Sequence, residues 1–134
     1  MSSNNAILTA FNDHFMEFVD DIERVFPNDH DILASKNAFI AMRKINPKLI
    51  IRVWCDVVVG KYKSEIEEGK IDYFLNKDYT QDVIDYPNSK KIIMGIDRLR
   101  NPLKEMNEES KGKSIKYIQN LSKLCLLYTN NTTY

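Results

Sequence analysis

The chain has 134 residues, which is the usual size of a single domain and enough to bury a core without a structural disulfide or metal ion. Its 43% hydrophobic and 28% charged residues exclude a disordered or fibrous protein, and its 19 basic and 19 acidic residues leave no overall charge to attract nucleic acid or membranes. Four glycines and four prolines are too few for a β-sandwich or barrel with many tight turns.

The first third of the chain predicts two helices. From Leu8 to Val25, apolar side chains recur every three or four residues, which is typical of one face of a helix. Pro27 ends this helix, because proline lacks an N–H group and restricts the residue before it. Asp29 or Asp31 can cap the next helix, whose apolar contacts extend to about residue 45.

The middle of the chain predicts one further helix, which starts at Asn46-Pro47 and ends at Gly69 as its C-cap. The β-branched run of residues 49–59 is also compatible with a buried strand, but its apolar positions do not alternate, and we therefore favour a helix. The side chains expected to face inward are Leu49, Ile50, Val53, Trp54, Val57, Val58, Tyr62 and Ile66.

Residues 70–88 read as an irregular connector with one short turn at 71–75. A second turn is capped by Thr80, with Val83 and Ile84 inside. Pro87-Asn88-Ser89 then opens another helix. Its apolar spacing is maintained through Pro102, so we expect a kink there rather than a break. The inward side chains of this helix are Ile92, Ile96, Leu99, Leu103 and Met106.

The last predicted helix follows a polar turn at residues 107–112 and places Ile118, Leu121, Cys125 and Tyr128 on one face. The fold class is therefore all-α, with about five main helices around one core. We expect a single domain over residues 1–134, frayed at 1–5 and 129–134.

Several features predict a location inside a cell. The chain has no stretch of about 18 apolar residues that could span a membrane. Its polar start lacks the basic head and apolar run of a signal peptide, so we expect no secretion. Two cysteines do not make a disulfide framework, and Cys55 and Cys125 are interpreted as buried, reduced thiols.

Catalytic chemistry has little support in the sequence. His14 lies on or beside the apolar face of the first helix, and His30 lies in a loop between two aspartates. Cys55 follows Trp54 within an apolar segment, which is unlike an activated nucleophile. No residues at ligand spacing suggest a metal site, and we expect no cofactor. A small enzyme built on these three residues is a distant alternative.

The neutral total charge conceals an uneven distribution. Residues 1–45 carry a net charge of −3 and residues 46–86 a net charge of −2, whereas residues 87–134 carry +5. The basic side chains that could bind an acidic partner or nucleic acid are Lys90, Lys91, Arg98, Arg100, Lys104, Lys113, Lys116 and Lys123. Lys113, Lys116, Asn120 and Lys123 form a polar stripe on the last helix.

Three interpretations of these basic residues remain open. They can be a solvated helix face, a surface for an acidic protein such as another copy of the chain, or a contact for nucleic-acid phosphates. The sequence lacks base-reading motifs. Any DNA binding should therefore be independent of sequence and weaken steeply with salt.

Aromatic residues on the first helix also allow two interpretations. Phe11, Phe15, Phe18 and Ile22 can fill the core of a monomer, which is the default. Their spacing of three and four residues can equally form a coiled-coil-like seam between two subunits. A homodimer is therefore a prediction of the sequence.

Several short stretches together carry a resemblance. They are Phe11-Asn12-Asp13-His14-Phe15, Glu17-Phe18, Val25-Phe26-Pro27, residues 48–54, Asp78-Tyr79-Thr80, Ile96-Asp97-Arg98-Leu99-Arg100 and residues 116–122. With them the chain resembles small helical proteins encoded by large nucleocytoplasmic DNA viruses of amoebae. This resemblance covers nearly the whole chain and supplies no catalytic residues. It implies a viral product in the virion or in the virus factory of the host cytoplasm, with viral proteins as partners.

The leading hypothesis is a non-enzymatic structural or interaction protein that self-associates and presents an acidic first helix and basic C-terminal helices. The alternative is a sequence-independent DNA-binding or DNA-packaging protein that uses the basic C-terminal helices.

Overall fold

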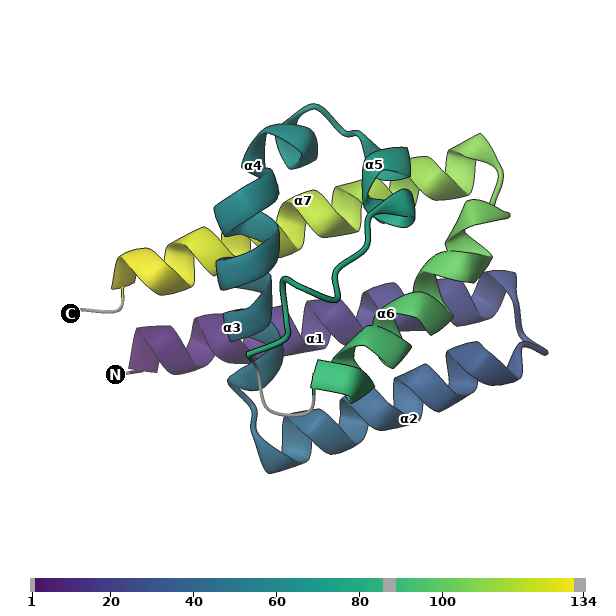
Figure 1. Cartoon of the computed structure of the whole chain (residues 1–134). Helices are drawn as coiled ribbons and strands as arrows, with labels where there is room; N and C mark the ends of the chain where they lie inside the picture. Colours follow the sequence, from purple (N-terminus) through teal and green to yellow (C-terminus); the bar gives the residue numbers. More distant parts are fainter. Residues whose placement is uncertain (1, 86–88, 132–134) are drawn as a thin grey trace.

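Two long helices, α1 (Ser2–Val25) and α7 (Glu108–Asn131), lie against each other and run in opposite directions, with both chain ends on the same side (Figure 1). The computed structural model describes residues 2–85 and 89–131, and all regular elements in these two ranges are helical. The all-α fold class and the prediction of a helix ended before Pro27 are confirmed. Residues 2–5 and 129–131, expected to fray, belong to these helices.

The second helix, α2 (His30–Ile45), packs against α1 and against α6 (Ser89–Lys104). Of the two predicted caps, Asp29 is the one used: its Oδ1 atom accepts hydrogen bonds from the backbone N–H groups of Asp31 and Ile32 at 2.9 and 3.2 Å. Helix α6 continues through Pro102 for two more residues, so the prediction that this proline does not break the helix is confirmed.

A π-helical segment interrupts the single helix predicted between residues 47 and 69. The chain forms α3 (Leu49–Val53), the π-helical segment η1 (Trp54–Val59) and α4 (Gly60–Glu67) in succession. A π-helix closes its hydrogen bonds over five residues instead of four and therefore rotates the following side chains around the axis. In α3, which precedes this segment, Ile51 is buried, while Leu49 and Ile50, expected to face inward, are only half-buried.

The connector after α4 contains one short helix followed by a turn. Gly69 has a φ of 71° and ends the preceding helix as predicted, and α5 (Ile71–Asn76) follows. The second turn predicted at Thr80 is present at residues 80–85, but Asp78 supplies the capping oxygen, because the N–H and Oγ1 of Thr80 both donate to Asp78 Oδ1. Val83 is buried as expected, whereas Ile84 is 55% exposed.

The polar turn predicted for residues 107–112 is much shorter than expected. The side chain of Asn107 accepts a hydrogen bond from the N–H group of Ser110 at 2.8 Å, so α7 begins at Glu108 and includes Gly112. Asparagine is a strong N-cap residue, and this cap outweighs the turn signal of the polar sequence that follows it.

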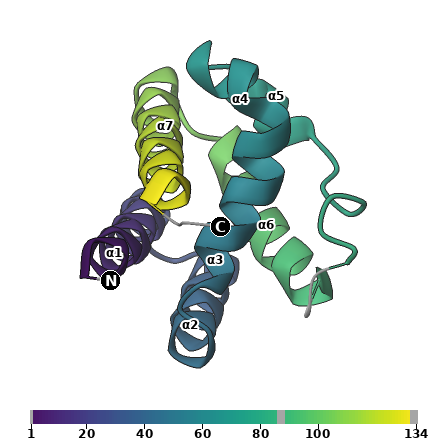
Figure 2. The ribbon, with the colours of Figure 1, turned by 90° about the vertical axis from the view of Figure 1, so that its left-hand side faces the viewer.

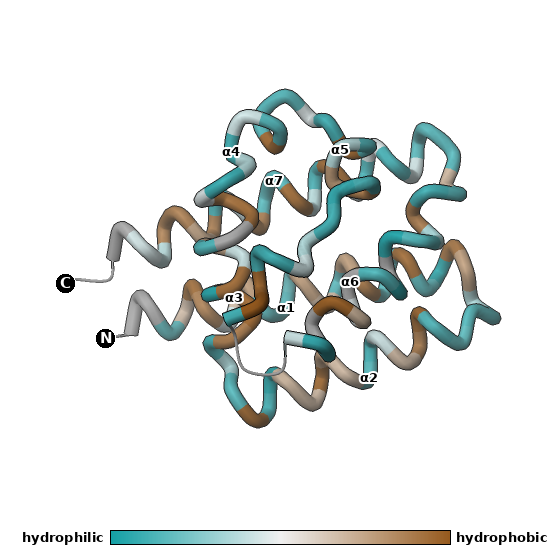
Figure 3. Tube along the Cα trace, in the orientation of Figure 1, coloured by the Kyte–Doolittle hydropathy of each residue, from teal (hydrophilic) through white to brown (hydrophobic). Residues whose placement is uncertain are grey.

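One hydrophobic core fills the space between the helices. Hydropathy along the chain follows this arrangement, with hydrophilic residues at the turns around α5 and between α6 and α7 (Figure 3). The largest fully buried side chains are Phe11, Ile22, Ile32, Ile51 and Leu121. The side chains of Val57, Ile92, Ile96 and Leu99, expected to face inward, lie outside the described residues, as do Pro87 and Asn88.

Candidate functional site

Three of the four lysines of α7 lie on one exposed face, whereas the fourth, Lys111, is half-buried and pairs with Asp72 at 3.5 Å. Lys113, Lys116 and Lys123 are exposed, and no ion pair to another described residue neutralises any of them. They lie on the opposite side of the helix from Ile118 and Leu121, which are buried. Asn120 and Leu127 continue the same spacing of three and four residues. We call Lys113, Lys116, Asn120, Lys123 and Leu127 the α7 lysine face.

The basic side chains of α6 do not extend this face. That helix packs on α2 and α5, whereas α7 packs on α1 and η1, and the two helices lie on different sides of the molecule (Figure 2). Lys90, Lys91 and Lys104 are exposed there, and Arg98 is half-buried. The single surface expected from eight basic residues is thus divided between two places.

Arg100, one of these eight, is engaged inside the protein. Its guanidinium pairs with Asp97 at 2.6 Å, donates a hydrogen bond to the carbonyl oxygen of Lys77 and lies 5.7 Å from the ring centre of Tyr79. Its donors hold the connector 77–85 against α6, so Arg100 is a structural residue and not part of an exposed binding surface.

The predicted self-association residues are buried within the single chain. Phe11 and Ile22 are fully buried, and Phe15 and Phe18 are 6% exposed. The ring of Phe15 meets that of Phe39 edge-on at 4.9 Å, and the ring of Phe18 stacks on Tyr117 at 5.2 Å. The default interpretation, a monomer core, describes these contacts. A dimer would need a different surface.

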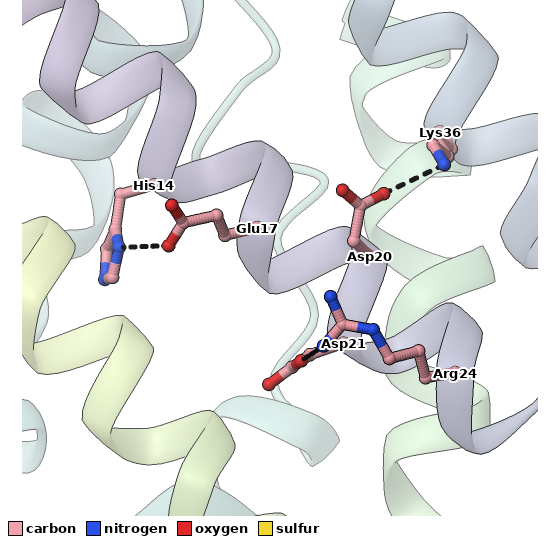
Figure 4. Close-up of polar contacts among 6 residues, drawn as sticks. All are labelled: His14, Glu17, Asp20, Asp21, Arg24 and Lys36. Carbon is pink, nitrogen blue, oxygen red and sulfur yellow. Dashed lines mark hydrogen bonds and ion pairs between the residues drawn. The ribbon is translucent and has the colours of Figure 1, made fainter.

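The acidic side chains of α1 are paired inside the chain (Figure 4). Lys36 contacts both Asp20 and Glu23, at 2.9 and 3.1 Å, Arg43 contacts Asp13 at 2.8 Å, and Arg24 pairs with Asp21. Glu17 lies 3.3 Å from Nδ1 of His14. Four acidic side chains of α1 are thus paired with basic ones, and α2 supplies much of the compensating charge, whereas Glu17 is exposed and, among the described residues, has only the His14 ring as a partner.

The residues considered for catalysis are far from forming a reactive group. The ring of His14 packs 4.8 Å from that of Tyr117, while His30 is exposed at the start of α2. Cys55 is bonded to Cys125, and their α-carbons lie 5.7 Å apart. The prediction of two reduced thiols is thus wrong, because α7 brings Cys125 against η1. Sequence spacing gives no sign of this contact across 70 residues.

An apolar cavity of about 170 Å³ lies behind α3 and η1, and the sequence did not predict it. Side chains from α1, α2, α3, η1, α5, α6 and α7 line it. The lining includes Phe15, Phe39, Met42, Ile50, Val53, Trp54, Val58 and Leu103. The half-buried side chains of α3 and η1 are the ones that border this space.

The connector 77–85 closes one side of the cavity with Tyr79 and Val83. Asp82 fastens it to α4, because its carboxylate accepts hydrogen bonds from Tyr62 and Lys61, both at 2.8 Å. Burial opposes the charge, but these bonds hold the pKa of Asp82 below its ordinary value. Burial and the bond to Asp82 raise the pKa of Tyr62 to about 12.

Comparison with known proteins adds no relatives: no protein-family model, no curated protein and no solved structure matches this chain. The viral resemblance therefore stays a prediction. In the described part of the chain, no helix is long and apolar enough to cross a membrane. No three metal-binding side chains of His, Cys, Asp or Glu gather within residues 2–85 and 89–131.

Proposed function

We propose that this protein is a non-enzymatic interaction protein that binds an acidic protein partner through the α7 lysine face. One observation carries this proposal: the three lysines of the face are exposed without an ion pair among the described residues, whereas Asp13, Asp20, Asp21 and Glu23 of α1 are paired with basic side chains. No described ion pair therefore neutralises the positive charge of this face. An acidic partner would relieve the repulsion between the lysines.

The geometry of the face suits a helical or extended acidic segment. From Lys113 to Leu127 the face extends roughly 21 Å along one helix, at 1.5 Å per residue. A second copy of the same face is a poor partner, because two copies would place lysines against lysines. The proposed partner is therefore a different protein and not a second α7.

DNA binding through the same lysines is the second candidate. Three phosphate contacts would give a logarithmic salt dependence of roughly −2.7, which is weak for a DNA-binding protein. Leu127 favours the protein partner, since it is 51% exposed at the end of the face and has no role in binding phosphate.

The setting of this interaction follows from the viral resemblance, which implies a virion or a virus factory. The disulfide between Cys55 and Cys125 supports the virion, because disulfides persist on virion surfaces and are rare in the reducing cytosol. Detection of the oxidised protein in purified particles, with the reduced form in infected cytoplasm, is the expected result.

The experiment compares two probes and two variants. Fluorescence anisotropy measures binding of labelled poly-glutamate and of a labelled 30-base-pair duplex at low salt. Lys116→Glu with Lys123→Glu should abolish poly-glutamate binding. Lys90→Glu with Lys91→Glu changes the net charge equally on α6 and should leave that binding nearly unchanged.

Each outcome decides between the candidates. Stronger binding of the duplex than of poly-glutamate, lost in the α7 variant alone, would replace the protein partner by DNA. Binding of neither probe, or equal losses in both variants, would overturn the role of the α7 lysine face.

A further inference from the structure

The cavity beside η1 is partly open to the surface and is larger than the voids of an ordinary protein interior. Protein cores pack like organic crystals and leave few spaces larger than a water molecule. This cavity has a volume of about 170 Å³. An apolar cavity of about 150 Å³ is known to stay dry and to accept a benzene-sized molecule.

The polar groups of two lining side chains, Trp54 and Tyr79, form hydrogen bonds with other parts of the protein. The indole Nε1 of Trp54 donates to Oγ of Ser122 at 3.0 Å, and the hydroxyl of Tyr79 donates to the carbonyl oxygen of Phe74 at 3.2 Å. Neither group is free to bind a polar ligand. What these residues offer to the cavity is their carbon surface.

Among the described residues that line the cavity, Arg100 is the one that carries a charge, and its charge is compensated. Asp97 neutralises the guanidinium at 2.6 Å, and the carbonyl oxygen of Lys77 takes a further hydrogen bond. An anionic ligand would have to displace Asp97. A cationic ligand would find no free carboxylate in the lining. The site therefore discriminates against charged molecules of either sign.

We propose that this cavity binds one uncharged, apolar small molecule of about six to nine non-hydrogen atoms, such as a single aromatic ring with a short alkyl group. Binding is driven by burial of the ligand's apolar surface and by its contacts with the apolar side chains of the lining. Neighbouring aromatic rings of Phe15, Phe39 and Trp54 provide edges and faces for a ring-shaped ligand.

The proposal is tested with toluene as the probe and benzoate as its charged counterpart. NMR of the oxidised, full-length protein should show intermolecular contacts from toluene to the methyl groups of Met42, Ile50 and Val53. At a toluene concentration ten times its Kd, the folding equilibrium constant should increase about 11-fold. Benzoate at the same concentration should produce neither effect.

Two adjacent residues offer a matched pair of variants. Val83 is 1% exposed and lines the cavity, whereas Ile84 is 55% exposed and lies outside it. Val83→Phe should fill part of the space and weaken toluene binding at least tenfold, while Ile84→Phe should bind toluene as the unaltered protein does. If Val83→Phe does not fold, Met42→Phe serves the same purpose from α2.

Three results would overturn the proposal. They are the absence of contacts between toluene and the three methyl-bearing residues, equal stabilisation by benzoate, and unchanged toluene binding in a folded cavity-filling variant. None of these results depends on the α7 lysine face, so this test and that of the proposed function fail independently.

Discussion

The indole Nε1 of Trp54 donates a hydrogen bond to Oγ of Ser122 at 3.0 Å, and this hydroxyl in turn donates to the carbonyl oxygen of Ile118 at 2.8 Å. The first bond joins η1 to α7 across 68 residues of sequence, and the second holds the serine hydroxyl in place within α7. The disulfide between Cys55 and Cys125 lies one residue further along η1 and three residues further along α7. Together these links hold the π-helical wall of the cavity against the last helix.

Replacing Ser122 with alanine should leave the buried indole N–H without a partner and lower the free energy of unfolding by about 1–2 kcal/mol. Trp54→Phe alone removes the donor and some packing. Because both changes break the same bond, the double variant should lose less than the sum of the two single losses. Urea denaturation measures all three, and strict additivity would show that the hydrogen bond contributes nothing.

Removing the disulfide should destabilise the protein strongly. It closes a loop with a sequence separation of 70, for which chain entropy alone predicts about 4 kcal/mol. We expect Cys55→Ser with Cys125→Ser to lower the free energy of unfolding by about 2–4 kcal/mol. Dithiothreitol should lower the stability of the unaltered protein by a similar amount and leave the variant unchanged. Equal stability of the variant and the oxidised protein would contradict this prediction.

Two helical glycines predict opposite effects of the same substitution. A Cβ atom at Gly95 would meet Cζ of Phe39 at 3.0 Å, and Phe15 restrains that ring from another side. A Cβ atom at Gly112 would meet nothing within 4 Å. Gly112→Ala should therefore stabilise the protein by about 0.5–1 kcal/mol through helix propensity.

Gly95→Ala should instead destabilise the protein by about 1 kcal/mol, because the contact with Phe39 outweighs the propensity gain. Thermal unfolding of both variants under identical conditions measures the difference. A melting temperature for Gly95→Ala as high as that of Gly112→Ala would mean that Phe39 moves freely into the neighbouring cavity.

The bond between Tyr62 and Asp82 predicts a loss of stability in alkali. Folding raises the pKa of the Tyr62 phenol from 10.0 to about 12, so its contribution is complete below pH 10 and is lost as the pH rises through 12. Burial also raises the pKa of Tyr79 and Tyr117, so the unaltered protein should show a combined effect. In Tyr62→Phe, the free energy of unfolding, measured by urea denaturation, should decrease less between pH 10 and 12 than in the unaltered protein.

In acid, protonation of the Asp82 carboxylate should weaken its bonds to Tyr62 and Lys61. Folding lowers the pKa of Asp82 below 3.8, so its contribution is present above that value and is lost as the pH falls through the lower folded-state pKa. Asp82→Asn should reduce stability at neutral pH and show less of this acid-induced loss. An acid profile identical to that of the unaltered protein would contradict the role of Asp82.

Local signals predicted much of the helical architecture. The apolar spacing of α1, the block at Pro27, the cap at Asp29 and the left-handed turn at Gly69 all act within a few residues, so the sequence expresses them directly. The exposed lysines of α7 were also predictable, because the positions opposite a buried helical face must point outward. Even the missed start of α7 at Glu108 has a local cause in the Asn107 cap.

Contacts between distant segments could not be read in the same way. The docking of rigid helices decides which acidic side chain of α1 pairs with which basic side chain of α2. It also decides whether Arg100 faces solvent or Lys77, and whether Cys55 reaches Cys125. The cavity is of the same kind, since it is the space left where helices converge around the π-helical segment. Residue identity determines the local helices and their faces, because backbone hydrogen bonding and side-chain periodicity are local. The cavity and the internal pairing of charge are decided by packing geometry, which involves the whole chain at once.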